Sequence, residues 1–299
     1  MTEPQPLTAV TRCAALSLAR ADQRHGTAAP VARWLLIERA GPWGRNALLD
    51  SSLDADVARE VDRRCREAGV RVMLIRRPGR VVATATRRWA YVDSRLGTEG
   101  IWWGDYHSDR QLTEIPLDGS AGQHSTAAAY LVCTHARHDA CCAIRGRPVA
   151  AALAAQRPGQ AWECSHTGGD RFAANVVVLP HGLYYGTVTP ALVSGLVEAH
   201  EGGLVAPDLL RGRASLPMAV QAAQHHARRA VGDMRVTSLS PVHVQPLDAR
   251  TWRVLFAGDP ESVAVTVRAG ASDPLPRLTC SAAGSQRVTT FDLVEVVLI

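Results

Sequence analysis

Cysteine and histidine residues gather in two short segments of this chain, and this gathering limits what the chain can fold into. The segments read Cys133-Thr-His-Ala-Arg-His-Asp-Ala-Cys-Cys142 and Cys164-Ser-His-Thr-Gly-Gly-Asp170. Thiolates and imidazoles are the donors that transition metals and iron–sulfur clusters bind. A fold that uses them together must bring the two segments side by side. We therefore expect a redox metal site where they meet.

Composition indicates a globular protein of a reducing compartment. The chain is 46% hydrophobic and 20% charged, which is ordinary for a protein with a buried core. No apolar run approaches the ~20 residues of a membrane-spanning helix, and the first residues lack a secretion-signal pattern. An odd count of seven cysteines with an adjacent pair, Cys141-Cys142, makes a poor disulfide framework. We expect a cytoplasmic protein without a membrane partner, in which Cys13, Cys65 and Cys280 are inert buried thiols.

The charge pattern argues against nucleic-acid binding. The net charge of +5 comes from arginine alone, because the chain contains no lysine. The arginines are dispersed among aspartate and glutamate and form no long one-sided stripe. We expect no nucleic-acid partner, although a local arginine patch could attract an acidic redox protein.

Hydrophobic periodicity predicts two successive units with the order strand, loop, helix, strand, strand. After an N-terminal helix over residues 7–21, the first unit has strands over 34–38, 70–75, 81–86 and 89–92 and a helix over 54–68. The second has strands over 130–133, 161–164, 175–179 and 183–188, a helix over 147–156 that starts next to Pro148, and a further helix over 190–200. The predicted fold class is α/β, with an internal duplication. Because Pro42-Trp43-Gly44 takes the place of the cysteine-rich loop in the first unit, only the second unit is expected to hold a cofactor.

Three domains follow from this organisation. We predict a first α/β domain over residues 1–118, a cofactor-bearing domain over 119–206, and a helical and β-rich extension over 207–299. A turn-rich stretch from Pro116 to Ser125 predicts a linker between the first two. The extension is expected to contain a helix over 219–230 and strands of alternating polarity.

The spacing within the two segments does not match a zinc finger, because Cys133 and Cys142 are nine residues apart and no C-x-x-C pair follows. Cys133 is expected at a strand end and Cys142 near a helix N-terminus, whose dipole would stabilise thiolate charge. Gly168 and Gly169 would let backbone amides approach inorganic sulfides. Cys141 is expected to point away from its neighbour. His135 and His138 are expected to make local hydrogen bonds or to face solvent, with tuning of the site or proton relay as the alternative.

Taken together, these motifs resemble the sucrase/ferredoxin-like family. The resemblance lies in Cys133-Thr-His with Asp139-x-x-Cys142, in the Cys-Ser-His166-Thr-Gly-Gly loop, and in the segment from Arg171-Phe-Ala-Ala-Asn175 to Leu183. It covers roughly residues 130–200, and the region from Trp34 to Trp43 also resembles the family's first half. Members of this family are thioredoxin-like [2Fe–2S] ferredoxins. The resemblance therefore implies two thioredoxin-like modules in tandem, with a [2Fe–2S] cluster in the second.

The resemblance also implies a set of ligands. In the best understood branch, two cysteines and the two histidines of a His-x-Gly-Gly-His loop hold the cluster. Cys133 and Cys142 match the cysteines, and His166 matches the first histidine, but Asp170 stands where the second histidine belongs. Cys164 is the expected substitute, because thiolate suits iron better than carboxylate does. Asp170 is the alternative, either as an oxygen ligand or as a partner of His166.

The implied function is one-electron transfer between a reductase and an acceptor, without substrate chemistry. Mixed cysteine and histidine ligation would place the reduction potential above that of an all-cysteine cluster. A thiol-dependent oxidoreductase that uses Cys133 or the Cys141-Cys142 pair is the alternative, disfavoured by the missing C-x-x-C motif. A glycosidase is disfavoured because no paired carboxylates are recognisable. A mononuclear zinc or iron site also stays open.

Overall fold

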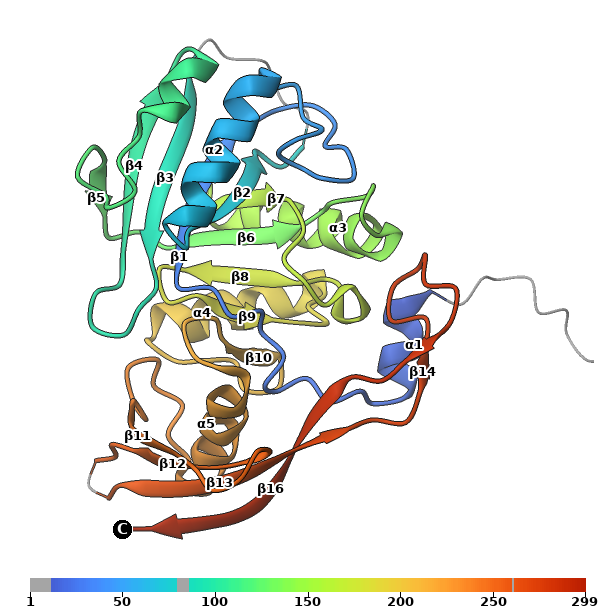
Figure 1. Ribbon diagram of the computed structural model, residues 1–299, viewed down its shortest axis with the longest axis vertical. Coiled ribbons are helices and arrows are strands. Elements are labelled where there is room, and N and C mark those ends of the chain that lie inside the picture. Colours follow the sequence, from blue (N-terminus) through green and yellow to red (C-terminus); the bar gives the residue numbers. More distant parts are fainter. Residues whose placement is uncertain (1–11, 80–85, 260) are drawn as a thin grey trace, which may run out of the picture.

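A ten-stranded sheet forms the body of the protein, and a smaller four-stranded sheet lies beside it (Figure 1). The computed structural model describes residues 12–79, 86–259 and 261–299. The strand order of the large sheet is β10-β9-β8-β6-β7-β2-β1-β3-β4-β5. Neighbours in this order come from both predicted units, so the two units share one sheet.

The elements of the large sheet divide into two sets along the chain. The first set is β1 (Arg33–Glu38), α2 (Ala55–Glu67), β2 (Arg71–Arg76), β3 (Arg87–Asp93), β4 (Gly100–Tyr106), the 3-10 helix η1 (Asp109–Thr113) and β5 (Gln123–Ser125). The second set is β6 (Ala129–Cys133), α3 (Ala140–Gln156), β7 (Ala161–Cys164), η2 (Asp170–Phe172), β8 (Val176–Leu179), β9 (Leu183–Tyr185), η3 (Pro190–Leu192), α4 (Val193–Glu201) and β10 (Leu210–Arg213).

Strand pairing is the same in both sets. β1 is parallel to β2 and antiparallel to β3, and β3 is antiparallel to β4. In the same way β6 is parallel to β7 and antiparallel to β8, and β8 is antiparallel to β9. The two halves meet where β2 pairs antiparallel with β7, with Ile75 opposite Cys164. The predicted α/β class and the predicted tandem of two like modules are thereby confirmed.

The domain boundaries stay predictions. β5 follows the proposed boundary at residue 118, yet it pairs with β4 of the first half. The segment from Pro116 to Ser125, predicted as a linker, therefore contributes a short edge strand to the sheet.

Both faces of the sheet are buried, and alternate residues of each strand enter different cores. Leu35 and Ile37 of β1 pack under α2, while Tyr130 and Val132 of β6 pack under α3. The intervening residues of both strands, including Trp34 and Leu131, meet in one central core between the two halves. Cys133 and Cys164 also belong to this central core.

Helix α3 begins earlier than predicted. It starts at Ala140 rather than at residue 147, so Cys141 and Cys142 lie in its first turn and Pro148 lies inside the helix. The reason is the side chain of Asp139, whose Oδ1 accepts the backbone N–H of Cys141 at 2.7 Å and caps the helix. The cysteine-rich segment predicted as a loop is therefore partly helical.

The C-terminal extension has the predicted helix and strands. Helix α5 (Met218–Val231) packs on the sheet of β11 (Pro241–Pro246), β12 (Thr251–Phe256), β13 (Val263–Ala271) and β16 (Thr289–Leu298). β14 (Leu275–Pro276) and β15 (Ser285–Gln286) form a small separate hairpin near the N-terminal helix α1 (Cys13–Ala19) (Figure 1). The predicted N-terminal helix over 7–21 is described only from residue 12 on, and residues 81–85 of the predicted strand over 81–86 lie outside the described residues. In the described ranges, no helix has both the length and the apolar character needed to cross a membrane.

Candidate metal centre

Three side chains that the sequence singled out converge at one point. The Sγ atoms of Cys133 and Cys142 and a ring nitrogen of His166 all lie within 4.8 Å of one another. Cys133 is the last residue of β6, Cys142 lies in the first turn of α3, and His166 lies in the loop after β7. The two segments therefore meet as their composition led us to expect.

Asp170 joins this group to a second, overlapping one. Its Oδ1 lies 3.1 Å from Cys142 Sγ and 3.1 Å from His166 Nδ1. Its Oδ2 lies 3.5 Å from Nε2 of His138. The His138 and His166 rings stack with centroids 3.5 Å apart, and these two residues with Asp170 form a second set of closely spaced donors. Sulfur, nitrogen and oxygen donors thus share one small volume.

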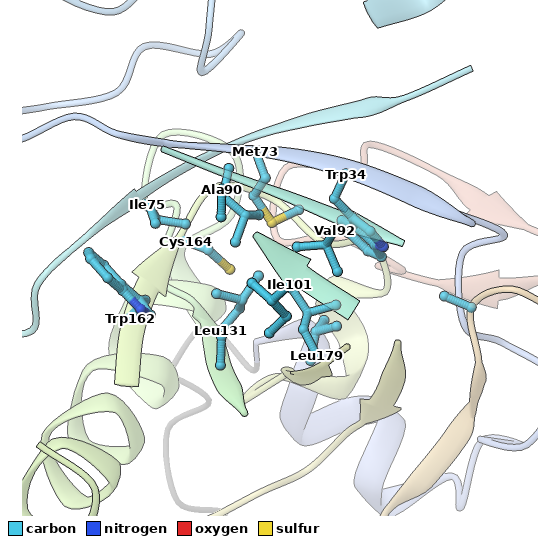
Figure 2. Close-up of a cluster of buried hydrophobic side chains, with 14 of the residues drawn as sticks. Trp34, Met73, Ile75, Ala90, Val92, Ile101, Leu131, Trp162, Cys164 and Leu179 are labelled. Carbon is cyan, nitrogen blue, oxygen red and sulfur yellow. The ribbon is translucent and has the colours of Figure 1, made fainter. Parts of the chain in front are cut away.

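Cys164 lies apart from these donor groups. Its side chain lies in the apolar core close to Ile75, Leu131 and Trp162 (Figure 2). It pairs in register with Cys133 on the neighbouring parallel strand, but its sulfur belongs to neither of the two donor groups at this site. Burial raises the pKa of the Cys164 thiol well above its usual value. This residue has the surroundings of a core side chain.

A glycine lets α3 approach the end of β6. A Cβ atom added at Gly146 would lie 2.2 Å from the carbonyl oxygen of Cys133. Any larger residue would push the helix away from the strand. The close contact at Gly146 keeps the first turn of α3, and with it Cys142, next to Cys133.

The glycine loop between His166 and Asp170 is held by Arg211 of β10. The Arg211 guanidinium is buried, and its Nη1 donates to the Gly168 carbonyl and to Oδ1 of Asn175, both at 2.8 Å. Gly169 has a φ of +78°, and a Cβ there would lie 2.4 Å from Arg211 Nη2. Glycine is required both by the backbone conformation and by the closeness of the arginine. The loop geometry that places His166 and Asp170 therefore depends on a strand 41 residues further along the chain.

The side chains of Cys133, Cys142, His166 and Asp170 shift one another's pKa values. A hydrogen bond from Cys142, aided by His166, lowers the pKa of Cys133 well below its usual value although burial opposes this. The pKa of Cys142 is raised in turn, because its proton is shared with Cys133. Burial alone would lower the pKa of His166, but Asp170 and Cys133 outweigh it and raise the pKa to about 9. A bound metal would take the place of the protons on Cys142 and His166.

The site is closed on its sulfur side and open on its imidazole side. Cys133 and Cys142 have no exposed surface, whereas the side chains of His166 and His138 are 26% and 34% exposed. These histidines face a cavity of about 380 Å³ whose lining also includes Arg45, Arg66, Arg71 and His135.

Comparison with known proteins places the chain in a family. A model of the family described as sucrase/ferredoxin-like matches residues 24–212, which is more than half of the chain and includes both halves of the sheet. The chain belongs to the sucrase/ferredoxin-like family. Among solved structures, it is similar to a thioredoxin-like [2Fe–2S] ferredoxin from Aquifex aeolicus, at 23% identity over 31% of this chain and 97% of that chain, with a TM-score of 0.27. No curated protein matches the chain.

Two contributors to the site in this sucrase/ferredoxin-like chain were not among the expected ligands. His138 was expected to make local hydrogen bonds or to face solvent, with tuning of the site as the alternative, and the structure stacks it on His166 and brings it to Asp170. Its position three residues after His135 was a usable signal, since both histidines lie in the cysteine-rich segment. Arg211 carried no signal, because nothing in its local sequence indicates that it is buried against the glycine loop.

Proposed function

We propose that this protein carries single electrons on a [2Fe–2S] cluster held by Cys133, Cys142, His166 and Asp170. The observation that carries the proposal is the convergence of two sulfurs, an imidazole and a carboxylate from two separate loops. Such a cluster, when bound, supplies a one-electron couple whose potential is raised by histidine ligation.

The donor set fits two irons with mixed ligation. Cys133 and Cys142 neighbour each other, and His166 neighbours Asp170, so the donors divide into a thiolate pair and an imidazole–carboxylate pair. Cys142 lies in the first turn of α3, where the helix dipole favours negative charge. The family membership supports the same assignment.

For the fourth ligand we propose Asp170 rather than Cys164. The Asp170 carboxylate already touches both Cys142 and His166, and its pKa is lowered by His138 and His166 against the effect of burial. Cys164 shares the central core with Cys133 and Cys142, but its sulfur belongs to neither of the two donor groups. His138 is the competing candidate, because its ring lies against His166.

The surroundings suit electron exchange at the histidine edge. The buried thiols are shielded from water, whereas His166 and His138 line the cavity and are partly exposed. Since Arg45, Arg66 and Arg71 line that cavity, we propose that a reductase and an acceptor dock there with acidic surfaces. We further propose a reducing compartment such as the cytoplasm, which would keep the thiols free to bind metal.

A thiol-dependent oxidoreductase is the second candidate, and one observation favours it. Cys133 has a lowered pKa and lies close to Cys142, as in a reactive dithiol. Both sulfurs are fully buried, however, and a substrate disulfide must reach a nucleophilic thiol. The burial of the pair favours the cluster.

Iron and acid-labile sulfide in anaerobically purified protein test the proposal. We expect both in equal amounts, with a visible spectrum and an EPR signal on reduction. The spectrum should be lost or shifted in Asp170→Ala and unchanged in His138→Ala. The opposite result would make His138 the fourth ligand in place of Asp170. Cys164→Ala is the matched control and should keep the wild-type spectrum. Iron-free protein with a rapidly alkylated Cys133 would instead establish the thiol chemistry.

A further inference from the structure

A second group of sulfur and oxygen donors lies on the other side of the Cys141-Cys142 pair. The Sγ atoms of Cys13, Cys141 and Cys280 and a carboxylate oxygen of Asp139 all lie within 4.8 Å of one another. Cys280 Sγ is 3.4 Å from Cys141 Sγ and 3.5 Å from Cys13 Sγ. Cys13 Sγ is 3.7 Å from both carboxylate oxygens of Asp139. All three cysteines are free thiols.

These spacings suit a single metal ion in tetrahedral coordination. Sulfurs bound to one Zn²⁺ at about 2.3 Å lie roughly 3.8 Å apart, close to the separations found here. A [2Fe–2S] cluster places two protein ligands on each iron, so three mutually close thiols suit a single ion better than such a cluster. Three thiolates and one carboxylate also complete the four-coordinate shell of a structural zinc site, which leaves no open position.

Asp139 is oriented toward the thiols by the backbone. Its side chain is buried, with 3% of the residue exposed. Oδ1 accepts the N–H of Cys141 at 2.7 Å, and Oδ2 accepts the N–H of Cys280 at 2.5 Å. The two N–H groups replace part of the hydration of this buried carboxylate, and a cation bound between it and the three thiols would offset the remaining cost of burying its charge. Hydrogen bonds that fix a ligand from behind are a regular feature of metal sites.

The group joins three segments that are distant along the chain. Cys13 begins α1, Cys141 lies in the first turn of α3, and Cys280 lies at the tip of the hairpin formed by β14 and β15. Figure 1 shows this hairpin beside α1, away from the four-stranded sheet. The hairpin has two residue pairs, Leu275 with Gln286 and Pro276 with Ser285, and so short a ribbon is not stable by itself. A metal bond at its tip would fix it to the body of the protein.

We propose that Cys13, Asp139, Cys141 and Cys280 bind one structural Zn²⁺ that ties the C-terminal hairpin and α1 to the start of α3. This site is separate from the proposed cluster, because adjacent residues on a helix point about 100° apart. Cys142 accordingly faces Cys133, while Cys141 faces Cys280. The proposal does not depend on the [2Fe–2S] assignment.

Metal analysis of purified full-length variants tests the site. We expect one zinc per chain in the wild type and in Cys133→Ser, and loss of that zinc in Cys280→Ser and in Cys13→Ser. Cys65→Ser, which removes a buried thiol of α2, is the matched control and should keep the zinc. Zinc that survives in Cys280→Ser, or that is lost in Cys133→Ser, overturns the assignment by placing the ion at the other donor group.

A measurement on the unmutated chain guards against variants that fail to fold. Wild-type protein in which Co²⁺ replaces the zinc should show the thiolate-to-cobalt charge-transfer bands and the intense d–d bands of a tetrahedral thiolate site. Absence of these bands, iron in place of zinc at these donors, or a mass spectrum with a disulfide between two of the three cysteines would each overturn the proposal. Cleavage of the hairpin by protease should also speed up several-fold on removal of zinc, and an unchanged rate contradicts the structural role.

Discussion

The two halves of the large sheet have the same strand pairing but different chemistry at equivalent positions. β1 ends with Glu38 and β6 ends with Cys133. Glu38 stands in register with Ile75, the second-last residue of the parallel strand β2, and Cys133 with Cys164, the last residue of β7. In the first half the strand-end carboxylate accepts the N–H of Arg88 at 3.0 Å. In the second half the strand-end thiol meets Cys142 and His166. The duplicated backbone creates the position, and the residue placed there decides whether it offers a metal ligand.

The same comparison assigns a role to Cys164. Its counterpart in the first half, Ile75, is an apolar core residue, and the two face each other where β2 pairs with β7. The pseudo-symmetry therefore marks this position as part of the core in both halves. We propose that a cysteine there fills space rather than binds iron.

The largest effect is expected at the two strand ends. Cys133→Ser should abolish iron and sulfide binding, because serine is a poor ligand for iron and the thiolate pair is broken. Glu38→Gln, at the equivalent position of the first half, should leave both unchanged. Iron and sulfide analysis checks the pair, and equal metal content in the two variants would contradict the division of roles between the halves.

Glycines in the loops after β2 and β7 should differ in what they tolerate. In Gly169→Ala the new Cβ would lie 2.4 Å from Arg211 Nη2, whereas a Cβ at Gly79, with a φ of +88°, would have no atom within 4 Å. Both substitutions strain the backbone by about 1–2 kcal/mol, and the clash should add about 1–3 kcal/mol at Gly169. The free energy of unfolding in urea measures the difference. Equal destabilisation would mean that Arg211 does not shape the loop.

Histidine pKa values differ between the candidate metal centre and the place where His25 contacts His225 of α5. The pKa of His166 is raised to about 9, but burial and the neighbouring histidines lower the pKa of His25 to about 3, and burial lowers that of His225 to about 4. The rings of His25 and His225 stack with their centroids 4.2 Å apart. Between pH 6.5 and about 4 the unfolded chain binds more protons at these two residues than the folded protein does. Stability should therefore fall as the pH drops, by up to about 1.4 kcal/mol per pH unit for each histidine.

Urea unfolding at pH 7 and pH 5 checks this dependence. His225→Gln should flatten it, while His243→Gln on the exposed strand β11 is the control and should not. A wild-type stability that rises on acidification would show that the stacked pair is charged in the folded protein.

The smallest effects are expected at the seam between the halves. Cys164→Ala should keep its iron and lose about 1 kcal/mol of stability, and Ile75→Val should lose a similar 0.5–1.5 kcal/mol, since both remove a small part of one core. Iron content and urea unfolding measure both. Loss of iron in Cys164→Ala alone would restore Cys164 as the fourth ligand.

Much of this arrangement could be predicted from the sequence. The strands over 34–38, 70–75, 130–133 and 161–164 were recognisable because buried strands give short apolar runs. The meeting of Cys133, Cys142 and His166 was expected because a metal site that uses both donor-rich segments must bring them together. The start of α3 was predicted too late, because the cysteine-rich segment was taken as a metal-binding loop and Asp139 was not recognised as a helix cap.

The choice between Asp170 and Cys164 could not be predicted in this way. Ligand preference alone favoured the thiol, whereas the direction of each side chain depends on strand register and on the turn after β7. Cys13 and Cys280 were taken from the sequence as inert buried thiols, and their meeting was not predicted, for a related reason. Their sulfurs lie 3.5 Å apart although 267 residues separate them, and nothing local in either segment indicates that they meet.

By itself the sequence determined the two repeated units and the strand-end position of the cysteines, because backbone periodicity is a local property of the chain. The tertiary structure alone decided which donors face one another, how Arg211 shapes the glycine loop, and that a second set of thiols assembles beside the first. These features depend on packing between segments that are distant in the chain. A shift of one residue in strand register or in the start of a helix would turn a side chain from a site into the core, or the reverse.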